Sequence, residues 1–244
     1  MSDRLFQLWA YLATTPLIGL TLTLATYLVA VRIHRQSGGH SLLNPVLVAV
    51  ALLVTILTAT GLSYERYFEG AQFVHFLLGP ATVALALPLY THFRRVKALA
   101  GPIAMTLLLG SMLAIVSAML VAALAGASWQ SVLSLAPKSV TTPIAMGVSE
   151  KIGGLPSLTA VLVILTGILG AATSGPVLRW LKVTDSAAQG FAIGMSAHGI
   201  GTARAFLINE ETGAFSALAM GMNGLLTAVL VPLFVPLVQR LLGL

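Results

Sequence analysis

Two polar stretches interrupt the apolar C-terminal half of the chain, and their residue types are suited to binding an anion. The first, PKSVTTP at 137–143, combines the cation Lys138 with three hydroxyl side chains. A proline lacks a backbone N–H and disfavours helix before it, so this stretch predicts a helix break with a new helix starting near Pro143. A helix N-terminus offers free N–H groups and a partial positive charge, which favour an anion.

The second polar stretch, SAHGIGTAR at 196–204, places an arginine in an apolar segment, and its glycines loosen the helix there. A charge in such a segment costs at least ~2.5 kcal/mol on membrane-insertion scales, so Arg204 is expected to face a partner or a wet cavity. Its guanidinium can hold a carboxylate through two parallel hydrogen bonds. His198 can accept a proton or donate a hydrogen bond.

We therefore predict a binding site for a small carboxylate at these two stretches. The arginine would hold the carboxylate, the lysine would add charge, and the hydroxyl groups would contact the oxygen substituents of the substrate. The candidate substrate-binding residues are Lys138, Ser139, Thr141, Thr142, His198, Gly199, Gly201, Thr202 and Arg204.

Each charged or titratable candidate also has a structural interpretation. Lys138 could extend to the membrane interface from a kinked helix, and His198 could be a hydrogen-bonded packing residue. Arg204 could pair with Glu150 or Glu210. Glu150 is either a surface loop residue or, like His198, a candidate for ion or proton coupling.

The composition predicts a helical membrane protein. Hydrophobic residues make up 57% of the 244 residues and charged residues only 8%, whereas soluble domains carry about 25% charged residues. Apolar and polar residues do not alternate along the sequence as they do in the strands of a β-barrel. The net charge of +6 comes mainly from cations in short connections, as in cytoplasmic loops, so no nucleic-acid partner is needed to explain it.

The sequence contains no pattern for catalysis, a metal or a cofactor. The absence of cysteine excludes disulfides, thiolate catalysis and cysteine metal sites. The histidines lack metal-ligand spacing, and neither a nucleophile motif nor a phosphate-binding loop is present. We expect no enzymatic activity, no metal and no cofactor.

The apolar runs predict an all-α polytopic integral membrane protein with about six full transmembrane helices. Two further segments, 129–150 and 187–208, each have apolar arms of about half the membrane thickness around a polar centre. They are re-entrant hairpins or, as the alternative, full crossings that bring the total to eight. The hairpins fit the positive-inside rule slightly better. The six runs lie at 10–31, 42–61, 71–90, 102–125, 157–178 and 214–239.

A shift of 60 residues aligns the two broken segments and the spans that follow them. It produces eight identities between 138–181 and 198–241, among them Thr142 with Thr202 and Glu150 with Glu210. One hairpin and one span per unit predict an inverted repeat, a plan that brings broken segments together at the membrane midplane. We therefore expect residues 1–126 to be a scaffold and residues 127–244 to be the substrate-binding core.

From Asn44 onward the chain resembles the LrgB/CidB family of membrane proteins, which is related to the plastidal glycolate/glycerate translocator. The chain departs from the expected family pattern at residue 147, where it has glycine and the family is expected to carry glutamate. This position therefore supplies no acidic group here. The matching stretches are FLLGPATVALALPLY at 76–90, SLAPKSVTTPIAMGVSEKIGGLPSLTA at 134–160, AHGIGTARAF at 197–206 and GAFSALAMGMNGLLTA at 213–228.

The resemblance implies two competing functions. Bacterial members are described as antiholin-like or holin-like regulators of murein hydrolase activity and cell lysis. Other relatives are implicated in moving glycolate, glycerate or pyruvate, often with a smaller LrgA/CidA-type membrane partner. Two matched broken segments suit a carrier better than a pore, so we predict alternating-access monocarboxylate transport, with proton or cation coupling left open. The expected setting is the bacterial inner membrane, as a multi-pass protein and a homo-oligomer.

Overall fold

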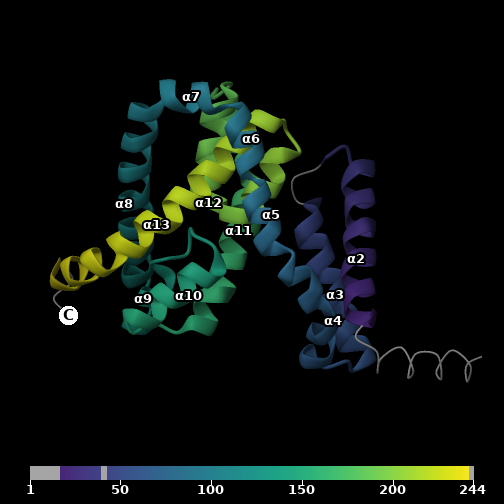
Figure 1. Cartoon of the computed structure of the whole chain (residues 1–244). Helices are drawn as coiled ribbons and strands as arrows, with labels where there is room; N and C mark the ends of the chain where they lie inside the picture. Colours follow the sequence, from purple (N-terminus) through teal and green to yellow (C-terminus); the bar gives the residue numbers. More distant parts are fainter. Residues whose placement is uncertain (1–16, 40–42, 242–244) are drawn as a thin grey trace, which may run out of the picture. The chain divides into compact units, whose positions relative to one another are not determined.

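The computed structural model describes residues 17–39 and 43–241, and the chain forms two compact units (Figure 1). The N-terminal unit comprises residues 1–84 and the C-terminal unit residues 85–244. All of the candidate site residues belong to the C-terminal unit. The expected division into scaffold and binding core after residue 126 is a functional one and stays a prediction.

The N-terminal unit is a group of packed helices. Helix α2 packs against both α3 and α4, and the hydroxyl groups of Thr23 and Tyr67 lie 2.8 Å apart at the α2–α4 contact. Asn44 caps α3 by accepting a hydrogen bond from the Val46 N–H at 2.8 Å. The helices are α2 (Leu17–Gln36), α3 (Pro45–Thr60), α4 (Tyr64–Phe76) and α5 (Leu78–Ala84).

The C-terminal unit contains two broken helical segments between long helices. The first broken segment comprises α9 and α10, and the second is α12. The helices are α6 (Ala86–Thr91), α7 (Phe93–Ala98), α8 (Ala100–Leu124), α9 (Trp129–Leu135), α10 (Thr142–Lys151), α11 (Pro156–Trp180), α12 (Ser186–Phe206) and α13 (Glu210–Leu241).

The described part of the chain is entirely helical between its turns, which confirms the predicted class. Within residues 17–39 and 43–241, five segments are long and apolar enough to cross a membrane: Leu17–Gln36, Tyr64–Thr91, Ala100–Leu124, Pro156–Trp180 and Glu210–Leu241. The expected run at 42–61 forms α3, which at 16 residues is shorter than these five. The start of the first expected run, 10–16, lies outside the described residues.

Helix α12 lies against α13, and this is the most extensive contact between any two of the described helices. Gly190 and Gly194 face α13, and a Cβ atom at either position would overlap with the backbone of Thr212 or Ser216. Small residues one turn apart allow two helices to approach closely in a membrane. This packing fixes the place of the α12 break relative to α13.

Two apolar clusters enclose a polar layer in the middle of the C-terminal unit. One cluster joins α8, α12 and α13 around Phe215, and the other joins α8, α9, α10 and α13 around Met119. Along α8, Ser111 lies between the residues of one cluster and those of the other, and Asn223 does so along α13. Both residues are buried. The polar residues at the helix breaks meet this layer.

Candidate functional site

The first break lies between α9 and α10, at the position that Pro137 and Pro143 predicted. Helix α9 ends at Leu135, and α10 begins at Thr142 with a proline in its first turn. Lys138 is half-buried in the break, and its Nζ donates to the Ser139 Oγ at 3.3 Å. Thr141 and Thr142 are half-buried at the start of α10. One cation and three hydroxyl groups are therefore gathered at a helix N-terminus.

The second break is at His198, within α12. This residue has φ 41° and ψ −131°, so α12 consists of two helical arms on either side of it. The sequence predicted that Gly199 and Gly201 would interrupt the helix, but neither of them has positive φ in the structure. A non-glycine residue in such a conformation costs on the order of 1–3 kcal/mol, so surrounding contacts must hold His198 in place.

One of those contacts is a buried hydrogen bond to α11. His198 Nε2 lies 2.9 Å from the Val163 carbonyl oxygen, and because a carbonyl can only accept, Nε2 carries the proton. Gly167 of α11 leaves room for the imidazole, since a Cβ there would lie 2.6 Å from the ring. This is the geometry of the packing histidine that the sequence left open, and a coupling role stays a prediction.

Helix α11 also brings the first break next to the second. Val163 is buried in a cluster with Val140 of the first break and Ala145 of α10. The two polar stretches, 60 residues apart in the sequence, therefore meet in the C-terminal unit.

Asn223 of α13 joins the two breaks directly. Its Nδ2 donates to the carbonyl oxygens of Ser139 and Met195, each at 3.2 Å. Its Oδ1 accepts from Ser111 at 2.6 Å and from Thr227 at 3.4 Å. Both donor hydrogens and both acceptor positions of the amide are thus used.

Asn223 and Ser111 are not among the residues predicted from the sequence, because both lie in apolar runs that predict ordinary spans. The available signal was an amide in the middle of the run at 214–239. A strongly polar side chain at that depth is expected to bond with a neighbouring helix or with released backbone groups.

The remaining candidates lie in the second arm of α12, after His198. Thr202 is buried, and its hydroxyl bonds to the His198 carbonyl at 2.8 Å and to Ser216 of α13 at 2.9 Å. Gly201 is also buried, whereas Gly199 is exposed. Arg204 is half-buried in the last turn of α12, about 9 Å along the helix axis from His198.

Glu150 is exposed near the end of α10, away from the break at that helix's start. Its position agrees with the surface interpretation, and its coupling role stays a prediction. Among the described residues, no group of three histidine or acidic side chains could hold a metal ion.

Arg95 of α7 connects both ends of α12. Its Nη2 lies 2.5 Å from Asp185 Oδ2, just before α12, and its Nε lies 2.7 Å from Glu211 Oε1, just after it. The second contact is an ion pair without the alignment of a hydrogen bond. These three residues place the start of α12, the start of α13 and α7 at one end of the C-terminal unit. Helices α9 and α10 lie at the other end (Figure 1).

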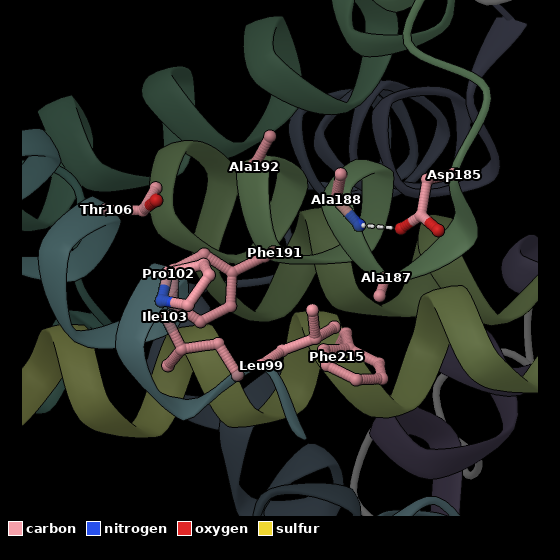
Figure 2. Close-up of a pocket in the computed structure, with 10 residues that line it drawn as sticks. All are labelled: Leu99, Pro102, Ile103, Thr106, Asp185, Ala187, Ala188, Phe191, Ala192 and Phe215. Carbon is pink, nitrogen blue, oxygen red and sulfur yellow. Dashed lines mark hydrogen bonds between the residues drawn. The ribbon is translucent and has the colours of Figure 1, made fainter. Parts of the chain in front are cut away.

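A cavity of about 200 Å³ reaches Asp185 of this ionic cluster (Figure 2). Its lining is mainly apolar and comes from α8, α12 and α13, with Asp185 at its edge capping α12 through the Ala188 N–H at 2.9 Å. None of the predicted site residues lines it. A second cavity of about 240 Å³ lies between α11 and α12 and reaches Ser196 at the start of the second polar stretch.

The chain is similar to several curated bacterial proteins over most of its length. The uncharacterized protein YwbG of Bacillus subtilis (strain 168) is 39% identical over 216 residues, covering 88% of this chain and 96% of the relative. The uncharacterized protein YxaC of the same strain is 35% identical over 91% of this chain and 96% of the relative. The antiholin-like protein LrgB of Bacillus mycoides (strain KBAB4) is 30% identical over 92% of this chain and 97% of the relative.

No solved structure matches the chain. The model of the LrgB-like family matches residues 23–237, which include all of α3 to α12, both helix breaks and Asn223. This agrees with the family that the sequence motifs indicated. The chain, a multi-pass helical membrane protein, therefore belongs to the LrgB-like family.

Proposed function

We propose that the chain transports small monocarboxylates, such as glycolate, glycerate or pyruvate, across the bacterial inner membrane by alternating access. The observation that carries this proposal is the meeting of two helix breaks around Asn223, with the half-buried Lys138 beside them. Broken helices at the membrane midplane supply free backbone groups and polar side chains for a substrate. A purely structural span needs neither a break nor a cation half-buried within it.

The first break would bind the carboxylate. Lys138 supplies the charge next to the Ser139 hydroxyl, and Thr141 and Thr142 offer two more hydroxyl groups at the start of α10. Because side chains on a helix lean toward its N-terminus, the long Arg204 side chain leans from the second arm of α12 back toward the break. In this proposal Arg204 completes the carboxylate site.

Both broken segments would be re-entrant hairpins. Arg95 pairs with an acid just before α12 and with another just after it, which supports α12 starting and ending at the same membrane face. The α11–α12 connection then lies at the α7 end, and α9–α10 must leave and return at the opposite face. The two hairpins would enter from opposite faces, as an inverted repeat requires.

Coupling and assembly are also part of the proposal. The carrier would work as a homo-oligomer, with proton or cation coupling, and a smaller LrgA/CidA-type membrane protein would be its partner. His198 and Glu150 are the candidates for coupling, although the His198 Nε2–H is engaged with the Val163 carbonyl.

A second candidate function is supported by the names of relatives. LrgB proteins of Bacillus mycoides and Bacillus cereus are called antiholin-like. These names favour a regulator of murein hydrolase activity and cell lysis over a carboxylate carrier. The buried polar layer and the helix breaks favour the carrier.

Reconstitution into liposomes separates the two candidates. We expect saturable uptake of radiolabelled glycolate or pyruvate, lost in Arg204→Ala and retained in Arg240→Ala, which removes an exposed arginine from the last turn of α13. A lysis regulator would instead release large trapped solutes or change autolysis without any carboxylate gradient. Full uptake by folded Arg204→Ala would reject the assigned site.

A further inference from the structure

We infer that Asn223 is a positioning residue that holds the two helix breaks in register around the substrate site. This inference rests on the proposed transport function and adds a residue that the family motifs did not single out. It begins with the fact that two backbone carbonyls, from segments far apart in the sequence, bond to one buried amide.

The two carbonyls need a partner because the helices around them are interrupted. Ser139 lies between α9 and α10, outside either helix. Met195 lies three residues before His198, in the last turn of the first arm of α12. Carbonyls in a last helical turn lack intrahelical partners, and a buried carbonyl without a hydrogen bond is costly in a membrane.

The partners also determine the orientation of the Asn223 amide. Carbonyl oxygens can only accept hydrogen bonds, so the Nδ2 group must face Ser139 and Met195. The opposite orientation would set Oδ1 against both carbonyl oxygens and lose both bonds. On the other side, the hydroxyl groups of Ser111 and Thr227 donate to Oδ1. The side chain is 1% exposed, so water does not supply substitutes.

Positioning both breaks matters for an anionic substrate. Carbonyl oxygens at the end of a helical arm carry partial negative charge and repel a carboxylate. Asn223 occupies these oxygens with its N–H groups, which leaves the positive N-terminus of α10 and Lys138 to act on the anion. It also ties Ser139, a predicted substrate contact, to the end of the first α12 arm.

The variant Asn223→Asp tests this role with little change in shape. The aspartate keeps the acceptor oxygens for Ser111 and Thr227 but places oxygen where N–H groups meet the two carbonyls. We expect the KM for glycolate uptake in proteoliposomes to rise about tenfold or more. The matched control Asn209→Asp, an exposed site at the α12–α13 connection, should change KM less than about twofold. The uncharged Asn223→Ser should also raise KM, because one hydroxyl cannot donate to both carbonyls. A rise in Asn223→Asp alone would reflect the added negative charge and would overturn the positioning role.

A distance measurement tests the same inference without transport. The chain has no cysteine, so spin labels can be attached to Gly147→Cys in α10 and Ala203→Cys in the second arm of α12. A Cβ at Gly147 meets open space, and Ala203 is exposed. We expect Asn223→Asp to broaden or shift the distance distribution between these labels, and Asn209→Asp to leave it unchanged.

An unchanged distance distribution together with an unchanged KM in folded Asn223→Asp would overturn the inference. If this variant cannot be recovered folded, Asn223→Ser, which adds no charge, is measured in the same way against the same criteria. A wild-type protein that takes up no carboxylate would overturn the proposed function, while the label distances would still decide whether Asn223 holds the two breaks together.

Discussion

At the residue scale, the candidate site consists of polar side chains and backbone carbonyl groups at the two places where helices are interrupted. Lys138 lies beside the hydroxyl of Ser139 at the first break, and His198 holds the second break through the Val163 carbonyl. Asn223 then bonds to one carbonyl from each broken segment. The meeting point of the breaks therefore contains a cation that the sequence predicted, Lys138, and an amide that it did not, Asn223.

Removal of the Lys138 charge should weaken carboxylate binding. Charges in a low-dielectric interior interact several times more strongly than charges in water, and Lys138 is half-buried. We expect Lys138→Met to raise the KM for glycolate or pyruvate about tenfold or more, measured as initial uptake rates over a range of substrate concentrations.

Lys151→Met is the matched control for this prediction. Lys151 is an exposed lysine at the end of α10, remote from the break at the start of that helix. Its loss should leave KM unchanged. Equal KM values for the two lysine variants would show that Lys138 does not contribute to carboxylate binding.

The prolines show how much of the site could be predicted residue by residue. Pro137 and Pro143 determine the first break locally, because a missing N–H and a steric restriction act within a few residues. At the second break the glycines suggested the right region but the wrong residue. His198 takes the strained conformation because a hydrogen bond from another helix holds it there.

At the element scale, the second broken segment, α12, packs closely against α13. Gly190 and Gly194 are one turn apart and allow the backbone of Thr212 and Ser216 to approach. This pair is not among the predicted features, although two small residues spaced by one turn are a known signal for helix contacts in membranes. The contact holds the first arm of α12 against α13.

A pair of identical substitutions tests this contact. Gly194→Ala should destabilise the protein by about 1–3 kcal/mol, because its methyl group overlaps with the Ser216 backbone. Gly147→Ala adds the same methyl group in α10, where a Cβ meets open space, and should stabilise by up to ~1 kcal/mol through helix propensity. Thermal unfolding in detergent measures both, and similar melting temperatures would contradict the close contact.

At the scale of the whole molecule, the question is how the chain crosses the membrane. The five long apolar segments of the described residues indicate a multi-pass protein. Whether the two broken segments cross the membrane or turn back decides on which side the α10–α11 and α11–α12 connections lie. In the hairpin arrangement the α10–α11 connection is outside and the α11–α12 connection is inside. Full crossings would reverse both.

Single cysteines distinguish these arrangements, since the chain contains no native cysteine. With a membrane-impermeant maleimide applied from outside, we expect Ser157→Cys to react and Thr184→Cys to stay unlabelled. Ile208→Cys is the control, because its connection is inside in both arrangements. All three positions are exposed. Reaction at Thr184→Cys together with protection at Ser157→Cys would establish full crossings instead.

The sequence by itself determined the helical membrane class, the family, the approximate spans and the existence of two polar breaks. These follow from composition, apolar run length and proline, which act locally along the chain. Only the tertiary structure decided that both breaks meet at Asn223 and that His198 bonds to α11. It also decided that Arg204 lies more than a turn beyond the break. The physical reason is that a carbonyl released by a broken helix has no preferred partner in its own segment, so helix packing selects the side chain that satisfies it.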